Sequence, residues 1–416
     1  MAGRGADSGL MLRDRAFLFI LLTLLIDAIG IGIVFPIMPD LMERVGAGSN
    51  AEGSAWAGLT MAAYAGAMFL AGPAIGSLSD AVGRKPVLLA ALALLAIDYV
   101  IMANATTLWL LLVGRLVAGL AGSTYITATA YIADISTAED KAARFGMIGA
   151  AFGIGFVLGP ALGGLAAEIS ISAPFWIAAI LAAANCLFGV FVLPESLKPE
   201  NRRPFGRREL NPFGQIGTAY RLPGLALPLA ILFVFEFANM VYPTLWAFWI
   251  REVFAWETWA IGLSLAAYGV LLAAVQGGLM PVLIARLGDY RTLILGLSAA
   301  VIGMIGFGFT GSVTLLVIFL VTAALSDLAP PLLTAMSSNL IDETRQGLVQ
   351  GVIASQASLA SVLAPLVMTG IFNRFAAPDA AVYLPGAPFL VSAVLVLAIF
   401  PFALRLGRPA LDRKGA

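Results

Sequence analysis

The chain has 416 residues, of which 60% are apolar and 12% are charged, and its mean hydropathy is +0.95. Soluble domains carry about 25% charged residues, so this chain lacks the charge that a water-facing surface needs. The 24 basic and 24 acidic residues cancel, the single cysteine is Cys186, and histidine is absent. These features exclude a soluble enzyme, a disulfide-bonded secreted domain and a disordered regulator. The composition predicts an all-α membrane protein.

Windows of about 19 residues predict twelve transmembrane helices in two pseudo-symmetric bundles of six. The first bundle occupies residues 16–193, with helices near 16–40, 56–79, 86–104, 108–134, 145–167 and 174–193. The second occupies residues 225–405, with helices near 225–249, 259–284, 292–310, 313–339, 347–372 and 387–405. We expect a cytoplasmic N-terminus at 1–15, a cytoplasmic linker at 194–224 and a cytoplasmic tail at 406–416.

The basic residues predict the orientation. With the N-terminus inside, 20 of the 24 Lys and Arg residues fall in cytoplasmic segments, and only Arg44, Arg251 and Arg374 fall outside. Basic loops are retained in the cytoplasm, so both termini are expected there. The basic linker is interpreted as an orientation signal, with binding of anionic lipid as the alternative.

An internal repeat joins the two halves. Residues 72–90 and 277–295 align so that Gly83 pairs with Gly288, although the second copy lacks the counterpart of Asp80. A parallel duplication of this kind predicts a ligand site between the halves, near the middle of the membrane.

The loop after the second predicted helix has the pattern GxLxDxxGRK, and its residues Gly76, Asp80, Gly83, Arg84 and Lys85 are the predicted gating motif. Gly83 permits the positive φ of a tight turn, and Gly76 is expected to let a neighbouring helix approach. Asp80 is expected to meet the positive N-terminus of another helix. A generic basic loop is the alternative, which six matched positions at fixed spacing disfavour.

The fourth predicted helix places Arg115 inside an apolar span. Insertion of an arginine at mid-helix costs about 2.5–3.5 kcal/mol, so an arginine without a structural or functional role is not expected there. We interpret Arg115 as part of proton coupling, with a purely structural ion pair as the alternative.

The fifth predicted helix carries the pattern GxxxGPxxGG, formed by Gly155, Gly159, Pro160, Gly163 and Gly164. Glycines four residues apart form one smooth face for close helix packing, and Pro160 allows a bend. Packing alone is one explanation of the pattern, and a functional motif is the other.

Four carboxylates fall inside predicted spans: Asp27, Asp98, Glu236 and Asp327. A rise of about 1.5 Å per residue places Asp27 and Asp98 about 18 Å from the cytoplasmic edge, and Arg115 at about 20 Å. Charges at one level are expected to face one another or a wet cavity, because lipid would penalise them. Carboxylates among apolar groups bind protons readily, so we predict proton coupling by Asp27, Asp98, Arg115 and Glu236. For Asp98, a hydrogen-bonded structural role is the alternative.

Taken together, these motifs resemble a known family. The loop motif is similar to that of the major facilitator superfamily. The segments LLIDAIGIGIVFPIMPDL, LAIDYVIMA, GRLVAGLAG, LPESLK and RQGLVQG resemble the bacterial tetracycline–proton antiporters along nearly the whole chain. The resemblance implies that Asp27 and Asp98 belong to the transport pathway and that Arg115 takes part in proton transfer. It also implies that GxxxGPxxGG is an antiporter motif, which favours export.

The chain departs from that family at several positions. The family has an arginine where Ala81 stands, and Arg84 or Asp134 is expected to compensate. In the second half, Leu272 replaces a functional histidine, Val301 an aspartate, Glu236 and Met240 two glutamines, and Asp327 a small residue, whereas Gln276 is retained. The chain therefore lacks residues through which the family contacts tetracycline in the eighth and ninth helices.

The predicted substrate contacts are Asp27, Glu236, Asp327, Tyr242, Trp246 and Gln276. For the aromatic members, packing is the alternative. We expect proton-driven efflux of a hydrophobic or amphipathic drug, tetracycline-like or multidrug, across a bacterial inner membrane by a monomer. We expect no cofactor, no metal, no nucleic-acid partner and no enzyme activity. The alternatives are a proton symporter or facilitator for a sugar or metabolite, and a non-transporting sensor.

Overall fold

The computed structural model describes residues 3–122, 124–137, 140–203, 205, 217, 219–341 and 345–406, without the side chains of residues 3–14, 142 and 347. Linker residues 206–216 and residues 407–416 of the predicted tail lie outside the described residues.

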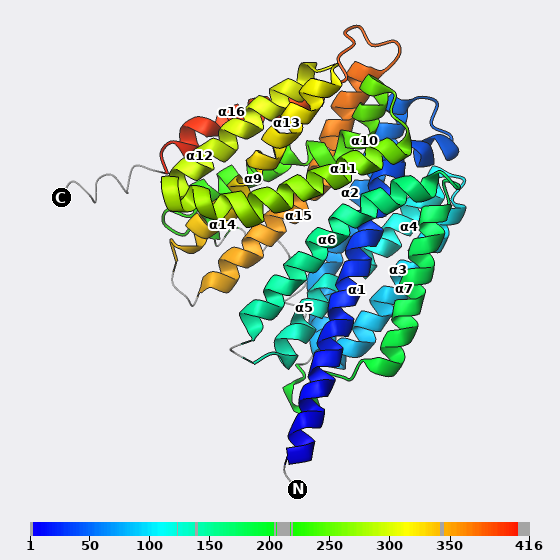
Figure 1. The fold of residues 1–416 in the computed structure, drawn as a ribbon, viewed down its shortest axis with the longest axis vertical. Helices are drawn as coiled ribbons and strands as arrows, with labels where there is room; N and C mark the ends of the chain where they lie inside the picture. Colours follow the sequence, from blue (N-terminus) through cyan, green and yellow to red (C-terminus); the bar gives the residue numbers. More distant parts are fainter. Residues whose placement is uncertain are drawn as a thin grey trace, which may run out of the picture. The chain divides into compact units, whose positions relative to one another are not determined.

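The described chain is a succession of helices (Figure 1). The first half contains α1 (Gly3–Arg44), α2 (Asn50–Val82), α3 (Arg84–Asn104), α4 (Leu108–Ala121), α5 (Thr124–Ile135), α6 (Lys141–Ala167), α7 (Ala173–Val192) and the short η1 (Pro199–Asn201). The second half contains α9 (Ala226–Asn239), α10 (Val241–Phe254), α11 (Thr258–Ala274), the π-helical turn η3 (Val275–Leu279), α12 (Met280–Phe309), α13 (Val313–Ser326), α14 (Ala329–Ser338), α15 (Gln346–Ala376) and α16 (Ala387–Ala403).

Eleven segments of the described chain are long and apolar enough to cross a membrane. The difference from the predicted twelve comes from one segment, Thr258–Phe309, which has 52 residues. At about 1.5 Å per residue it is about 78 Å long, far more than a hydrocarbon core of about 30 Å. Within it, Gly288 has φ 77° and ψ 165°, outside the helical range. Gly83, its predicted counterpart, has φ 116°, so both copies of the repeat turn the chain at a glycine.

Three of the predicted helices are interrupted. The fourth consists of α4 and α5, the seventh of α9 and α10, and the tenth of α13 and α14. Proline explains two of these breaks, because it lacks the N–H that would bond to the carbonyl four residues earlier. Pro243 follows the break at Met240, and Pro330 and Pro331 follow the break at Asp327.

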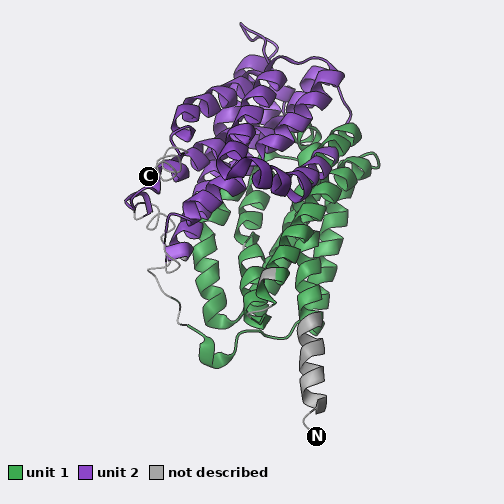
Figure 2. Ribbon diagram, turned by 60° about the vertical axis from the view of Figure 1, so that its left-hand side comes forward, with its two compact units in different colours: residues 1–46, 63–212, 258–266 green, residues 47–62, 213–257, 267–416 purple. Residues whose placement is uncertain are grey.

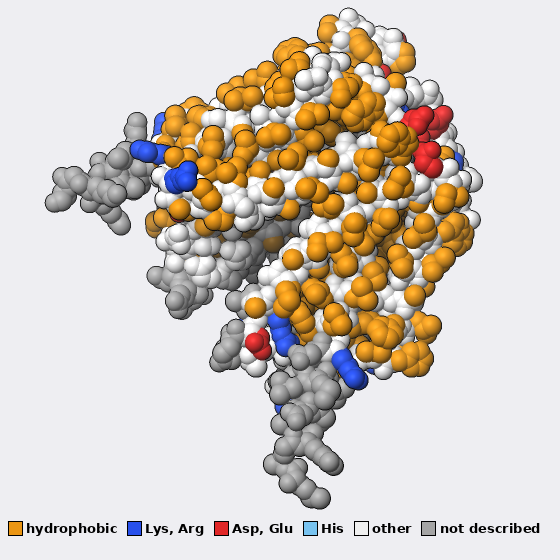
Figure 3. Space-filling model, in the orientation of Figure 1, with side chains coloured by type: hydrophobic (Ala, Val, Ile, Leu, Met, Phe, Trp, Pro, Cys, Tyr) orange, Lys and Arg blue, Asp and Glu red, His pale blue; other side chains and the backbone are white. Residues whose placement is uncertain are grey.

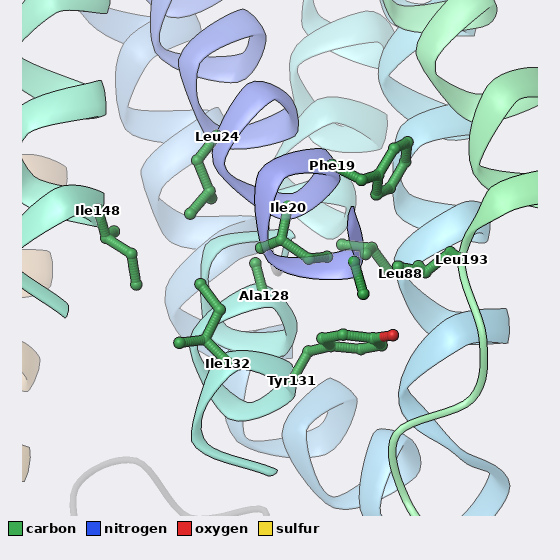
Figure 4. Packing of buried hydrophobic residues seen from close by; sticks show 10 residues of the cluster. Phe19, Ile20, Leu24, Leu88, Ala128, Tyr131, Ile132, Ile148 and Leu193 are labelled. Atoms are coloured by element: carbon green, nitrogen blue, oxygen red, sulfur yellow. The ribbon is translucent and has the colours of Figure 1, made fainter. Parts of the chain in front are cut away.

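The chain forms two compact units (Figure 2). Unit 1 contains residues 1–46, 63–212 and 258–266, and unit 2 contains residues 47–62, 213–257 and 267–416. In unit 1 a buried cluster joins α1, α3, α5 and α6 (Figure 4). Its largest members include Phe19, Ile20, Tyr131 and Ile148.

Large apolar side chains also lie on the outside of the helices. Trp109, Ile169 and Phe191 are each more than three-quarters exposed. On the face drawn in Figure 3, hydrophobic side chains cover the helices and the charged ones lie near helix ends. A water-facing protein rarely exposes large contiguous apolar surface, so this is the surface expected of helices in lipid.

The glycines of α6 form the packing face that their spacing predicts. A Cβ on Gly159 would lie 2.6 Å from the carbonyl oxygen of Ile29, and one on Gly163 would lie 2.6 Å from that of Ile33. Gly155 meets the same helix at Ala28. Backbone therefore packs directly on backbone between α6 and α1, which only glycine permits.

We predict that Gly159→Ala destabilises the protein, because the added methyl group meets backbone that cannot rotate away. Overpacking of this kind costs about 1–3 kcal/mol. The matched control is Gly153→Ala on the same helix, where a Cβ has no neighbour within 4 Å. Thermal unfolding in detergent, followed by size-exclusion chromatography, should show a lower midpoint for Gly159→Ala only. Equal midpoints for the two variants would contradict the packing argument.

Candidate functional site

The charged residues predicted to share one depth in the first half are brought together in unit 1. Asp98 of α3 forms an ion pair with the Nη2 of Arg115 on α4. The Asp98 side chain is fully buried and that of Arg115 is 12% exposed. Gly114 makes this contact possible, since a Cβ there would lie 2.8 Å from Asp98 Oδ1.

Asp27 lies beside this pair without joining it. Asp27, Asp98 and Arg115 all interact electrostatically with the hydroxyl groups of Tyr64 and Tyr99. Arg115 also lies over the Tyr64 ring, 5.7 Å from its centroid, within the range of a cation–π interaction. Neither tyrosine has a signal in the sequence, because tyrosines in a membrane-spanning helix more often pack than function.

A contact between Gly30 of α1 and the Tyr99 side chain of α3 lies one turn from Asp27. Gly30, one turn after Asp27, leaves the space that the Tyr99 ring fills, and a Cβ there would lie 2.8 Å from Tyr99 Cζ. Asp27 is 7% exposed, and none of the salt bridges between described residues involves it. Unit 1 therefore buries one paired carboxylate and one carboxylate without a counter-ion.

The loop between α2 and α3 is held by a second set of charges. Arg84 Nη1 lies 2.5 Å from Asp80 Oδ1, and its Nε lies 3.2 Å from Asp134 Oδ2. The same guanidinium donates to Ser79 Oγ at 2.6 Å. Arg84 and Asp134, either of which is expected to compensate for the missing arginine at Ala81, thus form an ion pair with each other.

Two details of this loop differ from the prediction. The N-terminus of α3 is met by Glu195, which accepts from the backbone N–H groups of Arg84 (2.9 Å) and Lys85 (3.2 Å). Asp80, expected to meet a helix N-terminus, instead pairs with Arg84. The expected close approach at Gly76 is also absent, because a Cβ there would make an ordinary 3.9 Å contact with Ile126.

The two carboxylates of the second half lie in unit 2. Asp327, between α13 and α14, accepts hydrogen bonds from the amide of Asn239 (3.2 Å) and from the hydroxyl of Tyr268. Glu236 lies one turn before Asn239 on α9 and interacts electrostatically with Asp327. Gln276, in the π-helical turn, donates to the backbone carbonyl of Asp327 at 3.3 Å. No salt bridge between described residues involves either carboxylate.

The aromatic residues of the seventh predicted helix lie in a packed cluster within unit 2. Trp246 contacts Trp249 and Phe307 with centroid separations of 5.7 and 5.4 Å, and Tyr242 contacts Phe307 at 5.8 Å. Trp246 is 4% exposed and Trp249 is fully buried. This environment favours the packing alternative for Trp246. Tyr242 differs, because its buried hydroxyl has no hydrogen-bond partner among the described residues.

We predict that Asp98→Asn destabilises the protein, since it leaves the Arg115 charge buried and unpaired. Breaking a buried ion pair costs about 3–5 kcal/mol. The double variant Asp98→Asn/Arg115→Gln should recover much of this loss, and Asp27→Asn should cost little, because no ion pair is broken. Thermal unfolding of the purified variants measures all three. A double variant less stable than Asp98→Asn would contradict the ion-pair account.

Comparison with known proteins gives the family. Residues 20–326 match the Major Facilitator Superfamily. The chain is 38% identical over 397 residues to the class C tetracycline resistance protein of Escherichia coli, covering 95% of this chain and 98% of that protein. It is 35% identical to the class G tetracycline resistance protein of Vibrio anguillarum, with the same coverage.

Solved structures agree on the fold. A bacterial homologue of the human lysosomal transporter Spinster, in an inward-facing and occupied conformation, superposes with a TM-score of 0.78 at 15% identity, covering 95% of this chain and 97% of that one. The chain is a multi-pass, non-enzymatic membrane protein that belongs to the major facilitator superfamily and is related to the tetracycline resistance efflux proteins.

Proposed function

We propose that the protein exports a hydrophobic or amphipathic drug in exchange for protons, by alternating access across a bacterial inner membrane. The observation that carries the proposal is Asp27, a carboxylate buried in a membrane-spanning helix with no counter-ion among the described residues. An ionised carboxylate is costly in such a position, so binding of a proton or of substrate is the natural way to neutralise it.

The neighbouring groups support a coupling role for Asp27. The Asp98–Arg115 pair keeps its own charge balanced, and the hydroxyl groups of Tyr64 and Tyr99 interact with all three charges. We place Asp98 and Arg115 in the proton pathway, and we assign Asp27 to competition between proton and drug. Because only one of the two can neutralise Asp27 at a time, proton entry would release the drug.

The relatives suggest the substrate class. Two proteins that are at least 35% identical to this chain are named as tetracycline resistance proteins, and we propose a tetracycline-like or multidrug substrate. Asp27, Glu236, Asp327, Tyr242 and Gln276 remain proposed substrate contacts, and Trp246 is the weakest because it is packed among aromatic rings. The monomeric state and the cytoplasmic position of both termini remain proposals as well.

We predict that Asp27→Asn lowers the rate of export driven by a proton gradient by at least tenfold, while the protein remains folded. The asparagine keeps the shape of the side chain but cannot exchange a proton. Inverted membrane vesicles energised with a pH gradient, screened with tetracyclines and unrelated cationic drugs, provide the measurement. The control is Glu43→Gln, an exposed carboxylate near the end of α1.

Undiminished export by Asp27→Asn would refute the assignment of Asp27 to proton coupling.

The direction of proton movement distinguishes export from the alternative function, uptake. Adding substrate to vesicles without a gradient should drive protons opposite to the substrate in an antiporter, and in the same direction in a symporter.

Glu236→Gln should also weaken drug resistance, because it removes a partly buried carboxylate of a membrane-spanning helix that has no ion-pair partner among the described residues. The measurement is the drug concentration that inhibits growth of cells producing equal amounts of each variant. Full resistance in cells that carry Glu236→Gln would exclude Glu236 from the transport cycle.

A further inference from the structure

Unit 2 contains a group of oxygen atoms whose negative charge the proposed export cycle leaves unbalanced. We define the Asp327 cluster as Glu236, Asn239, Tyr242, Tyr268 and Asp327. Asp327 is 9% exposed, and its two carboxylate oxygens accept from Asn239 and Tyr268. Asp327 also interacts electrostatically with Glu236, Tyr242 and Tyr268. These five residues come from α9, α10, α11 and the junction of α13 with α14.

The charge of the Asp327 cluster is unbalanced. Glu236 and Asp327 carry two carboxylates, and neither forms a salt bridge with a described residue. In unit 1 the comparable Asp98 is neutralised by Arg115. Two ionised carboxylates that interact inside the membrane repel each other, so the cluster needs a positive charge, and no described residue supplies one through a salt bridge.

Several oxygens in the Asp327 cluster also lack partners. The side-chain oxygen of Asn239 and the hydroxyl of Tyr242 are buried without a hydrogen-bond partner among the described residues. Tyr242 is itself 9% exposed. Buried polar atoms are nearly always satisfied in native proteins. The Asn239 and Tyr242 oxygens lack partners beside two carboxylates that have no counter-ion among the described residues. This combination indicates a binding site for a cation.

The helices around the Asp327 cluster are interrupted next to it. The helix breaks at Met240 and Asp327 and the π-helical turn at Gln276 all border it. Prolines 243, 330 and 331 remove the N–H groups that would bond to the carbonyls of Asn239, Ser326 and Asp327. Of these, the Asp327 carbonyl accepts from Gln276. Carbonyls freed at broken membrane helices are known ligands for alkali ions and sites of proton binding.

We propose that the Asp327 cluster binds a sodium ion. A sodium ion accepts lone pairs from the unpaired Asn239 and Tyr242 oxygens as well as from the carboxylates, whereas a proton on Asp327 would leave the Asn239 oxygen without a partner. A large organic cation would have to displace the Asn239 and Tyr268 bonds to reach Asp327. The cluster also lacks the third acid of a typical divalent site, and the described residues contain no group of three potential metal-binding side chains.

The first test is direct binding of ²²Na⁺ to the purified full chain in choline chloride buffer. Wild type should bind it saturably, with competition by unlabelled NaCl. Asp327→Asn should weaken binding at least tenfold, and Tyr268→Phe, which removes only a hydroxyl, should weaken it severalfold. The matched control is Tyr290→Phe in the same unit, where the hydroxyl donates to the Leu404 carbonyl away from the cluster.

Tryptophan fluorescence gives a second readout that requires no radioisotope. Tyr242 and Trp246 both contact Phe307, so an ion at the Tyr242 hydroxyl should change the emission on addition of NaCl. KCl at equal ionic strength should give a weaker change. The NaCl response should vanish in Asp327→Asn, provided that this variant elutes as a folded protein. If it does not, Tyr268→Phe decides the question.

The proposal is overturned if wild type shows no saturable ²²Na⁺ binding, or if Asp327→Asn binds as wild type does. Proton release that depends on Asp327 without sodium binding would also overturn it and make the cluster a proton site. The sodium site does not rest on the proposed function. Asp27→Asn should retain sodium binding while losing proton-driven export, so the two proposals fail separately.

Discussion

The cost of placing charge among apolar helices governs both units of this protein. A carboxylate or guanidinium inside a span is tolerated only when it is paired, neutralised or wet. Unit 1 meets this constraint for Asp98 by a direct ion pair with Arg115, and leaves Asp27 unpaired beside it. In unit 2, no salt bridge between described residues involves Glu236 or the buried Asp327. These carboxylates, which form no salt bridge with a described residue, therefore mark where we expect the protein to take up a proton or another cation.

Backbone packing determines where these charges lie. Glycines on α6 let α1 approach backbone to backbone, and Gly30 on α1 receives the ring of Tyr99. Asp27 thereby interacts electrostatically with the same two tyrosines as the Asp98–Arg115 pair, Tyr64 and Tyr99. The glycine pattern thus has a structural role that does not depend on transport. A functional role of the same pattern would act through the close contact that it creates.

Much of this arrangement could be predicted from the sequence. Hydropathy located the spans, and counting residues along three helices placed Asp27, Asp98 and Arg115 at one level, where the structure brings them together. The positive φ of Gly83 and Gly288 agrees with the repeat. These features follow from local composition and a constant helical rise, which do not depend on the partner that each helix meets.

The remaining features depend on tertiary contacts that no local pattern encodes. Glu195 reaches the N-terminus of α3 from beyond α7, more than a hundred residues away. Tyr64, Tyr268 and Asn239 resemble ordinary packing residues until their neighbours are known. The breaks at Met240 and Asp327 had a sequence signal in Pro243, Pro330 and Pro331, since proline withholds the donor that a continuous helix needs.

The two copies of the repeat have diverged in how they use charge. The first copy retains Asp80, and Arg84 links it to Asp134 in the loop between α2 and α3. The second has Ala285 at the equivalent position and retains only the turn at Gly288. In the membrane the relation is reversed, because the first half pairs Arg115 with Asp98, whereas no described residue forms a salt bridge with Glu236 or Asp327 in the second half. Two acids for which the described residues supply no base are tolerated among apolar helices only if they are neutralised by a proton or by another cation. The asymmetry of charge between the halves therefore points to ion binding in the second half more directly than any single residue does.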